Sequence, residues 1–330
     1  MPEGCGGFGH IVREKSYISG MKRWLTILLI MVPVFTWCRG QSVRSQEEGR
    51  FWVTTQEDSL LAERILTDLS SVIEKSRNAG PTEEDLSEGI ISVADLMVQA
   101  GKELLGQPYV AGTLDEKMDG DEWKEELRIY LTRTDCIIFV ETCLALARTA
   151  AKGGDFQMFA DEVRQSRYRS GNVGAYADRL HYTTEWARQG ESRGVLKDVT
   201  RDLGGAPLVH PINYMSAHPG SYPLMDDPAA IMAAEDRLNA QPRYCIPKNR
   251  LGEALKDIRT GDIICLVTSV EGLDISHVMM AVVENGAVRL LHASTGPMKV
   301  VMDGRTLPEY LSGRSSVIGI QVLRPLEVTE

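Results

Sequence analysis

The chain has 330 residues, of which 43% are hydrophobic and 25% are charged, and its formal net charge at pH 7 is −10. The length allows one large domain or two ordinary ones, and the composition is that of a globular protein. The acidic balance argues against a protein that binds nucleic acid, because such a protein would present a basic face to the phosphate backbone.

The first forty residues carry the pattern of an export signal. Met21-Lys22-Arg23 precedes an apolar run, residues 24–37, that is too short to span a bilayer comfortably. We therefore interpret residues 1–40 as a non-native extension followed by a signal. The mature protein is expected to be exported to the periplasm, with no stable membrane span. A lipid anchor on Cys38 is the alternative.

The cysteines of the expected mature chain are scattered along it. Four isolated cysteines in a large exported chain do not make a disulfide framework, and no C-x-x-C pair indicates a metal site. We therefore expect no metal and no cofactor. The four residues are Cys136, Cys143, Cys245 and Cys265.

The N-terminal part of the mature chain is predicted to be helical. Residues 41–80 form an N-terminal helical segment in this interpretation, because apolar residues recur at helical spacing from Leu60 to Ile73. A second helix is expected between Thr82 and Leu105, and a glycine-rich turn over residues 106–112 ends it. Residues 113–130 are interpreted as an acidic surface excursion.

A buried helix follows, with a cysteine in its first turn. Thr134 or Asp135 is suited to cap it, and apolar residues dominate from Cys136 to about Ala151. A helix N-terminus carries partial positive charge and unpaired N–H groups, which favour a thiolate and could hold an oxyanion. Taken alone, Cys136 is better explained as a small buried hydrophobic residue, as most free cysteines are.

A long insertion, about residues 155–245, separates this helix from the strands that follow. It is dense in arginine, and its second half contains an irregular stretch from Pro207 to Pro223. Loops of this length inside a compact domain are usually functional or disordered, and the aromatic residues here argue against disorder.

The C-terminal third is predicted to be rich in β-strands. Apolar strands are expected from Ile263 to Thr268, from Ile275 to Val283 and from Ala287 to Ala293, with further strands near residues 300 and 320. Asn285-Gly286, between the second and third strands, is the strongest short-range signal for a hairpin. Helices followed by an antiparallel sheet give the fold class α+β.

The register of that hairpin predicts that two histidines meet. If Asn285-Gly286 is a two-residue turn, Glu284 pairs with Ala287. His277 and His292 then lie on the same face of the hairpin as diagonal neighbours. Diagonal residues are about 7–8 Å apart at Cα and less at their side chains, which brings two imidazoles within reach of each other.

Together with the upstream cysteine, this pair of histidines indicates nucleophilic catalysis. Cys136 would be the nucleophile, and His277 would accept its proton and later protonate the leaving amine. His292 would orient His277, as the third member of a triad does. A metal site built from the same three residues is the alternative, although they lack the short ligand spacing of common zinc motifs.

Four motifs surround these residues. They are Asp135-Cys136 at the start of an apolar helix, Ser276-His277-Val278 after Gly261-Asp262-Ile263-Ile264, Leu291-His292-Ala293, and the turn from Gly106 to Gly112. Together they resemble the NlpC-type papain-like cell-wall hydrolases. The resemblance implies a papain-like catalytic domain over residues 81–330, with N-terminal helices and the nucleophile on a central helix packed against an antiparallel sheet. It also implies that Tyr109 and Asp135 lie beside the nucleophile, where Tyr109 would help to form the oxyanion hole.

Two motifs in the insertion narrow this resemblance. The segments from Arg179 to Trp186 and from Asn213 to His218 are similar to a branch of the superfamily, the N-acetylmuramoyl-L-alanine amidase-like proteins of Bacteroides-type bacteria. The resemblance implies cleavage of the amide between the muramoyl lactyl group and L-alanine in soluble peptidoglycan fragments (muropeptides), for cell-wall turnover or recycling. The chain departs from the common pattern in its longer gap between Tyr109 and Cys136 and in its long insertion.

Side chains of the insertion are candidates for substrate binding. Stem peptides are anionic, and arginine is suited to bidentate recognition of carboxylates. Each arginine could instead be a solvated surface charge, and the aromatic and histidine side chains could simply hold the loops. The candidates are Arg167, Arg169, Arg179, His181, Tyr182, Asn213 and His218.

Three other functions are compatible with the same features. An endopeptidase would cut the γ-D-glutamyl–diamino-acid bond of the stem peptide. A binding protein would hold wall fragments at an inactive site, and an acyl transferase would use the same fold. The sequence gives no indication of the oligomeric state.

Overall fold

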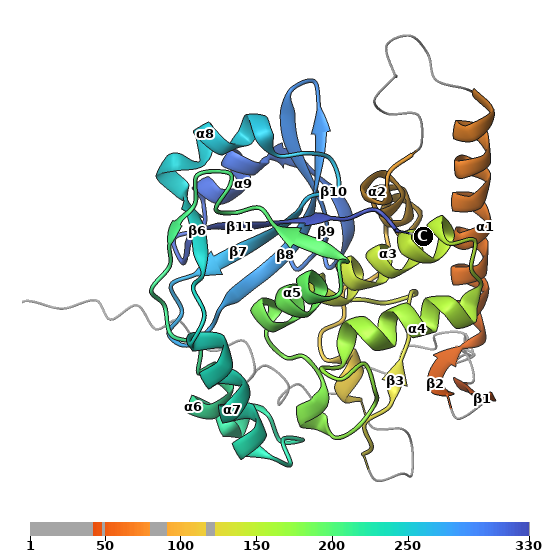
Figure 1. Cartoon of the computed structure of the whole chain (residues 1–330), viewed down its shortest axis with the longest axis horizontal. Helices are drawn as coiled ribbons and strands as arrows, with labels where there is room; N and C mark the ends of the chain where they lie inside the picture. Colours follow the sequence, from red (N-terminus) through yellow and green to blue (C-terminus); the bar gives the residue numbers. More distant parts are fainter. Residues whose placement is uncertain (1–41, 48–49, 80–90, 117–122, 330) are drawn as a thin grey trace, which may run out of the picture. The chain divides into compact units, whose positions relative to one another are not determined.

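The computed structural model describes residues 42–47, 50–79, 91–116 and 123–329, and Figure 1 shows how their helices and strands are arranged. The expected export signal, Cys38 and the expected helix start at Thr82 lie outside these residues. The described residues belong to one compact unit, Gly40–Glu330.

In the described chain, helices dominate the first part and strands the last. The α-helices are α1 (Gln56–Ala79), α2 (Val93–Glu103), α3 (Cys136–Ala151), α4 (Phe156–Arg167), α5 (Thr183–Ser192), α6 (Tyr214–Ala217), α7 (Pro228–Asn239), α8 (Leu251–Ala254) and α9 (Leu307–Ser312). The 3₁₀ helices are η1 (Thr113–Asp115), η2 (Tyr176–Asp178), η3 (Pro219–Ser221), η4 (Lys248–Arg250) and η5 (Leu255–Asp257). The strands are β1 (Ser42–Glu47), β2 (Arg50–Thr55), β3 (Leu127–Arg128), β4 (Leu196–Asp198), β5 (Ala206–Pro207), β6 (Tyr244–Pro247), β7 (Ile263–Thr268), β8 (Ile275–Glu284), β9 (Ala287–Ser294), β10 (Lys299–Thr306) and β11 (Val317–Pro325).

The larger sheet has eight strands in the order β10-β9-β8-β7-β11-β6-β5, with β4 beside β11. Its strand pairs are antiparallel, as the sequence predicts. The predicted hairpin is confirmed, because Glu284 pairs with Ala287. The φ angle is 51° at Asn285 and 75° at Gly286. A two-residue type I′ turn requires positive φ at both positions, which an Asn-Gly pair adopts readily.

Helix α3 lies between the large sheet and helices α1 and α4 (Figure 1). It packs against α1, α2 and α4 on one side and against β8 and β9 on the other. Its residues from Ile138 to Ala150 are all buried, and the two charged ones, Glu141 and Arg148, are paired with Arg167 and Glu162. The predicted bounds of this helix are confirmed. Gly153, with φ of 66°, follows its C-terminus in the left-handed conformation that ends many helices.

The N-terminal segment begins with strands, whereas the sequence analysis expected it to be helical throughout. β1 and β2 pair antiparallel, and β2 pairs with β3 in parallel. The segment from Phe51 to Thr55 consists of aromatic and β-branched residues, which favour an extended chain. Helix α1 then begins where the Thr55 hydroxyl accepts a hydrogen bond from the Asp58 N–H at 3.0 Å. The helical pattern from Leu60 to Ile73 is confirmed.

Helix α1 is tied to the segment that leads into α3. The carboxylate of Asp58 is completely buried. It accepts hydrogen bonds from the N–H of Leu131 and from the N–H and hydroxyl of Thr132, each at 2.8 Å. Ile65 and Leu69 of α1 share one hydrophobic core with α2 and α3. The start of α1 therefore fixes the backbone just upstream of the α3 N-terminus.

The described part of segment 113–130 is not an acidic surface excursion, so that prediction was wrong. Glu125, Glu126 and Arg128 are buried. The hydroxyl of Tyr168 donates a hydrogen bond to the Glu125 carboxylate at 2.7 Å. Burial of these carboxylates is possible because hydroxyl and guanidinium groups from distant segments offset the loss of hydration.

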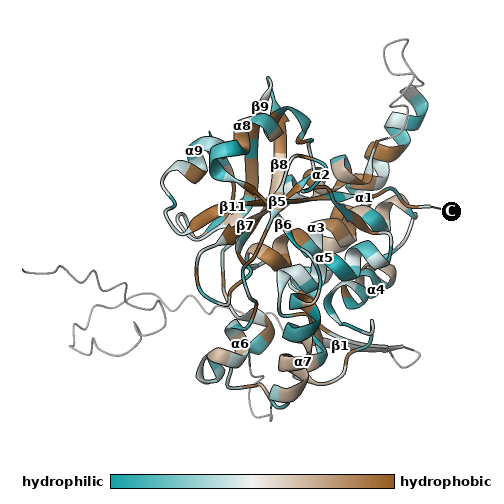
Figure 2. Ribbon diagram, turned by 60° about the vertical axis from the view of Figure 1, so that its left-hand side comes forward, coloured by the Kyte–Doolittle hydropathy of each residue, from teal (hydrophilic) through white to brown (hydrophobic). Residues whose placement is uncertain are grey.

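The insertion folds into helices and short strands with a small core of their own. Even the irregular stretch from Pro207 to Pro223 includes helix α6. Figure 2 shows hydrophobic residues along the strands of the large sheet and more hydrophilic ones on α4 and α5. Within the described residues, no helix combines the length and the apolar character needed to cross a membrane. The core of the insertion consists of Tyr176, Ala177, Tyr182, Ile212, Met215, Ile231 and Leu238.

Candidate active site

Cys136 is the first residue of α3, where the sequence places it. Asp135 caps the helix, because its carboxylate accepts hydrogen bonds from the N–H groups of Ile137 at 3.1 Å and Ile138 at 2.9 Å. The sequence analysis expected the N–H groups of this helix end to be free for an oxyanion. The cap already uses two of them, whereas it does not use the N–H of Cys136.

The sulfur of Cys136 faces strand β8. The backbone N–H groups of Val278, of Ile137 and of Cys136 itself lie within hydrogen-bonding reach of it. The pKa of the thiol is nevertheless raised to about 12, chiefly because burial penalises the thiolate and secondly because the Asp135 carboxylate is close. Burial and Asp135 thus outweigh the helix end, which favours a thiolate, and the sulfur carries its proton at neutral pH.

The imidazoles of His277 and His292 meet, as the hairpin register predicts. Nε2 of His277 lies 2.7 Å from Nδ1 of His292, and the two ring planes are inclined at 82°. His292 is completely buried and His277 is half-buried. Val278, whose N–H faces the Cys136 sulfur, follows His277 directly in β8. The thiol and the histidine pair are thus neighbours.

Both imidazoles are neutral at neutral pH. Burial lowers the pKa of His277 to about 3, with further lowering by His292 and by the positive charge of Arg314. Burial lowers the pKa of His292 to about 4, although the Asp303 carboxylate acts in the opposite direction. A neutral imidazole beside a protonated thiol is in the state from which a general base acts.

Several residues around His292 were missed by sequence reasoning. Nε2 of His292 lies 3.6 Å from Oδ2 of Asp303 in β10. Arg305 holds that carboxylate with two hydrogen bonds, of 2.9 and 2.8 Å. The ring of Tyr310 stands edge-on to His292, with 5.4 Å between centroids, and the Arg314 guanidinium lies 4.0 Å from the Tyr310 ring centroid.

The register of β9 and β10 is the signal that could have found Asp303. Val301 pairs with His292, and side chains two residues apart on a strand share a face. Residues 295–298 contain Gly296-Pro297, which indicates a turn, but they have no Asn-Gly pair that would fix the register of a two-residue hairpin. The sequence alone therefore leaves this register open.

The glycine-rich turn brings Tyr109 to the site. Tyr109 forms a bridge with Thr134, and its N–H donates a hydrogen bond to the carbonyl of Met298 at 2.9 Å. Burial raises the pKa of the Tyr109 hydroxyl, and the negative charges of a Cys136 thiolate and of Asp135 add to this effect. The phenol therefore lies close to the sulfur, as the family resemblance implies.

The three arginines predicted to bind substrate are paired with carboxylates inside the protein. Arg167 and Arg179 are buried. A guanidinium that already has a carboxylate partner is a weaker candidate for binding a second anion, so the structure gives these arginines a role in holding the fold. The pairs are Arg167 with Glu141, Arg169 with Glu185 and Arg179 with Asp115, with shortest N–O distances of 2.5, 2.7 and 2.5 Å.

His181 and Tyr182 connect parts of the insertion. Nε2 of His181 lies 2.8 Å from the Tyr176 carbonyl oxygen. Burial lowers the pKa of His181 to about 4, and the charge of Arg179 adds to this effect. The hydroxyl of Tyr182 donates a hydrogen bond to Glu235 at 2.7 Å.

Asn213 and His218 also have contacts within the protein. The N–H of Asn213 donates to the Gly272 carbonyl at 3.0 Å. Nδ1 of His218 lies 2.8 Å from the Tyr214 carbonyl oxygen, and the two rings stack with 4.3 Å between centroids. The His218 contacts favour the alternative that its side chain holds the loop, whereas the Asn213 contact is made by the backbone.

A small cavity of about 70 Å³ lies beside the first turns of α3. It brings together four of the seven predicted substrate-binding residues, whereas Arg169, Asn213 and His218 are not among the described residues that line it. Its lining includes Ile137, Ile138, Glu141, Arg167, Arg179, Leu180, His181, Tyr182 and Trp186.

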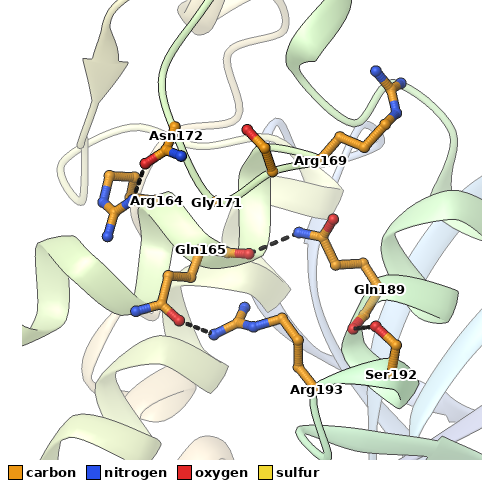
Figure 3. A pocket seen from close by; sticks show the side chains of 9 residues that line it. Arg164, Gln165, Arg169, Gly171, Asn172, Gln189, Ser192 and Arg193 are labelled. Carbon is orange, nitrogen blue, oxygen red and sulfur yellow. Dashed lines mark hydrogen bonds between the residues drawn. The ribbon is translucent and has the colours of Figure 1, made fainter.

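A larger cavity of about 320 Å³ opens between α4 and α5, and Figure 3 shows its lining. Gln165 is one of the lining residues: its backbone carbonyl accepts a hydrogen bond from the Gln189 side chain at 2.7 Å, and its own side chain accepts one from Arg193. Cys136 and the two histidines are not among the described residues that line this cavity, which is therefore separate from the candidate site. Across the described chain, no group of three or more His, Cys, Asp or Glu side chains is arranged to hold a metal ion.

Solved structures of similar proteins come from several bacteria. An N-acetylmuramoyl-L-alanine amidase from Bacteroides uniformis is 32% identical, with a TM-score of 0.64, over 71% of this chain and 99% of that one. A protein from Bacteroides fragilis whose name suggests a xylanase is 33% identical, with a TM-score of 0.59, over 68% of this chain and 98% of that one. A Legionella pneumophila protein shares the fold at 19% identity and a TM-score of 0.57, over 82% of this chain and 97% of that one.

Family membership follows from the extent of a sequence match. No curated protein matches the chain. The AmiA-like family matches residues 99–319, which is more than half of the chain and includes the cysteine and both histidines. The chain therefore belongs to the AmiA-like family, described as N-acetylmuramoyl-L-alanine amidase-like.

Proposed function

We propose that this protein is a cysteine amidase that hydrolyses the bond between the N-acetylmuramoyl group and L-alanine in soluble peptidoglycan fragments. The family and the Bacteroides uniformis amidase support the choice of bond. One observation carries the mechanism, the 2.7 Å contact between His277 Nε2 and His292 Nδ1. It leaves Nδ1 of His277 as the ring nitrogen available to Cys136.

The first step of the proposed reaction forms a thioester. The thiol proton of Cys136 moves to Nδ1 of His277 while the sulfur attacks the lactyl carbonyl carbon. The new C–S bond pushes the carbonyl π electrons onto oxygen. We assign the N–H of Cys136 and the hydroxyl of Tyr109 as donors to this oxyanion, because both lie beside the sulfur. The imidazolium then protonates the alanine nitrogen, and the C–N bond breaks.

The second step releases the sugar. A water molecule gives a proton to His277 and attacks the thioester carbonyl carbon. The C–S bond breaks, the muramoyl lactyl group leaves as a carboxylic acid, and the proton on His277 returns to the Cys136 sulfur. The products are the free muramoyl sugar and the intact stem peptide.

The resting protonation state determines how the proton moves. A thiol of pKa about 12 does not transfer its proton to an imidazole of pKa about 3 in the free protein. Proton transfer from Cys136 to His277 is therefore expected to accompany the attack, when the substrate carbonyl takes up the negative charge. This differs from a site with a thiolate–imidazolium pair formed in advance.

The position of the insertion supports a preference for small fragments. Leu180, Thr183 and Trp186 of the insertion line the small cavity together with Ile137 at the start of α3. A wall at this place would limit access by a cross-linked polymer. We therefore expect soluble muropeptides to be cleaved and intact sacculi to release little soluble material. Rapid solubilisation of sacculi would contradict this preference.

We further infer that the protein is exported to the periplasm. The inference rests on the basic residues that precede the apolar run over residues 24–37. Cell fractionation of the expressed full chain tests it, and intact chain in the cytoplasmic fraction alone would contradict it. Mass spectrometry of the mature N-terminus distinguishes simple cleavage from a lipid on Cys38.

Cleavage of a glycosidic bond, as the name of the Bacteroides fragilis protein suggests for that protein, fits this site poorly. Most glycosidases place two carboxyl groups on either side of the scissile bond. The carboxylates described here near the thiol and the histidines are already engaged. Asp135 caps α3, and Asp303 is held by Arg305.

Mass spectrometry of a muropeptide digest tests the proposed reaction. The amidase is expected to release the free sugar and the intact stem peptide. Loss of a dipeptide from the stem would instead indicate the γ-D-glutamyl–diamino-acid endopeptidase. Transfer of the muramoyl group to an added amine would indicate an acyl transferase.

The matched control is the Cys136→Ala variant. It is expected to lose turnover by at least about 1,000-fold, because removal of a catalytic nucleophile leaves only binding and electrostatic effects. Fragment binding measured by calorimetry should persist. Turnover that survives this substitution would rule out the cysteine mechanism, and binding without turnover in the wild type would indicate a wall-fragment binding protein.

A further inference from the structure

The Asp303 carboxylate lies on the side of His292 that faces away from His277. Nε2 of His292 is buried, and among the described residues it has no hydrogen-bond partner within the usual distance. The acceptor that faces it is Oδ2 of Asp303, at 3.6 Å. A buried ring nitrogen without a partner is unfavourable, so a contact slightly longer than a normal hydrogen bond calls for an explanation.

The carboxylate of Asp303 is held in place by Arg305. The backbone N–H of Arg305 donates to Oδ1 at 2.9 Å, its Nε donates to Oδ1 at 2.9 Å, and one of its terminal nitrogens donates to Oδ2 at 2.8 Å. These hydrogen bonds lower the pKa of Asp303 to about 2. An ionised carboxylate only accepts hydrogen bonds, so the nitrogen that faces it is expected to carry the proton.

The tautomers of both rings follow from this one acceptor. If Nε2 of His292 carries the proton, Nδ1 of the same neutral ring is an acceptor. The 2.7 Å contact then requires Nε2 of His277 to be the donor. In a neutral His277 ring this leaves the lone pair on Nδ1, which is where a base for the Cys136 proton is needed.

We propose that Asp303 is a positioning residue of the active site, whose carboxylate selects the tautomer of His292 and through it the tautomer of His277. The role rests on the proposed cysteine mechanism and extends the series Cys136, His277 and His292 by one residue. When His277 takes the thiol proton, the pair of rings gains a positive charge, and the Asp303 carboxylate lies next to that pair. The 3.6 Å contact is expected to shorten at that stage, because catalytic hydrogen bonds often tighten only in the reacting complex.

Other charged or titratable groups face the two rings and set their protonation. His292 is packed by His277 from β8, by Asp303 and Arg305 from β10, and by Tyr310 from α9. Arg314 follows α9 and acts on both rings, and the Cys136 thiol of α3 faces the N–H of Val278, the residue after His277 in β8. Of the carboxylates described here, Asp303 is the one whose charge raises the pKa of His292, while the arginines lower it. Removing its charge is therefore expected to lower the pKa of His292.

The test is nitrogen NMR of the histidine rings in the full-length protein, comparing wild type with Asp303→Asn. In the wild type both His277 and His292 are expected as the Nε2–H tautomer. In Asp303→Asn the amide can also donate, so a mixture of tautomers is expected. The kcat should fall roughly 10- to 100-fold, the loss typical of a group that orients another, while KM stays within about twofold.

Asp262→Asn is the matched control. Asp262 is a buried aspartate of the same sheet region, held by Arg324 with two hydrogen bonds of 2.8 Å. The Asp262→Asn substitution removes a negative charge from a similar aspartate–arginine pair, and the NMR signals of His277 and His292 are expected to stay unchanged. If Asp303→Asn does not fold, Arg305→Gln provides the second variant, because the Arg305 side chain is 54% exposed. It keeps the carboxylate but loosens it, and a partial shift of tautomers is expected.

The outcomes separate this proposal from the proposed function. Unchanged tautomers in Asp303→Asn would overturn the positioning role, whether or not kcat falls, since a fall alone would reflect only structure. Changed tautomers in a protein that cleaves no muropeptide would support the positioning role while contradicting the amidase. Changed tautomers together with the expected loss of kcat would support both.

Discussion

The protonated thiol of Cys136 determines how the site reacts before substrate arrives. At pH 7 a group with a pKa of about 12 is ionised in about one molecule in 10⁵. The helix N-terminus favours the thiolate, but burial and the neighbouring Asp135 carboxylate outweigh it. The site therefore resembles a base-assisted nucleophile more than a free thiolate.

This state predicts the pH dependence of thiol alkylation. The rate constant for reaction of native protein with iodoacetamide should rise about tenfold per pH unit between pH 6 and pH 10, because only the thiolate reacts. Labelling in the Cys136→Ser variant is subtracted to isolate this residue, and Cys143, Cys245 and Cys265 are buried. A plateau between pH 5 and pH 8 would show that a thiolate–imidazolium pair already exists.

The arginines show where sequence reasoning about single residues fails. The sequence can indicate that Arg167, Arg169 and Arg179 suit carboxylates, but it does not reveal which carboxylates are nearby. Each has its partner within the chain, at separations of 26, 16 and 64 residues respectively. Only the folded structure brings such pairs together, so the distinction between a substrate site and an internal ion pair was not available from the sequence.

Among the elements, those with local signals were predicted best. Helix α3 has a capping residue at one end and glycines at the other, and the β8–β9 hairpin has an Asn-Gly turn. The hairpin signal was sufficient to predict that His277 and His292 meet, whereas the place of Cys136 beside them was inferred from the chemistry and from the family resemblance. The β9–β10 register and the parallel β2–β3 pair depend on contacts between segments whose connections have no such signal. Asp303 was missed for that reason, whereas the N-terminal strand from Phe51 to Thr55 was missed although its aromatic and β-branched residues favour an extended chain.

The link between α1 and the start of α3 gives a prediction at this scale. Asp58→Ala leaves the buried N–H groups of Leu131 and Thr132 without their acceptor. We expect the free energy of unfolding to fall by about 2–4 kcal/mol, as for loss of a buried hydrogen-bond network. Urea unfolding measures it. The kcat should fall as well, because the released backbone leads directly into the nucleophile.

A matched substitution in α1 shows whether the loss of stability in Asp58→Ala comes from the buried hydrogen bonds or simply from removing an acidic side chain of this helix. Glu63 is exposed on α1, and Glu63→Ala is expected to change stability by less than about 0.5 kcal/mol. Equal losses in the two variants would show that the Asp58 contacts do not fix the segment before α3.

For the whole molecule, buried neutral histidines predict sensitivity to acid. The pKa is about 3 for His277 and about 4 for His181 and His292, all below the value near 6.5 expected in the unfolded chain. As the pH falls below 6.5, the unfolded chain binds protons that the folded protein does not, so folding stability is lost between about pH 6.5 and pH 4. Asp135, whose pKa is raised to about 6, gains a proton in the folded protein and partly opposes this loss.

Urea unfolding at pH 7, 6 and 5 measures this dependence. A net uptake of roughly two protons on unfolding corresponds to a loss of up to about 3 kcal/mol per pH unit. The His181→Gln variant, which changes a histidine away from the nucleophile, should reduce the slope by about one proton. A stability that stays constant from pH 7 to pH 5 would show that these rings are not held neutral.

The bridge between Tyr109 and Thr134 has a consequence for how this protein can diversify. The N–H of Val110 donates to the Thr134 carbonyl at 2.8 Å, and the N–H of Thr134 donates to the Pro108 carbonyl at 3.1 Å. These hydrogen bonds hold the two ends of the segment between Val110 and Thr134 together. The length of that segment can therefore vary without moving the Tyr109 phenol away from the Cys136 sulfur. This freedom ends towards α3, because the residues from Glu125 to Leu131 are buried and Asp58 holds Leu131 and Thr132. Natural variation, or an engineer, could therefore change the chain length only between Val110 and Glu125 while the reacting atoms keep their places.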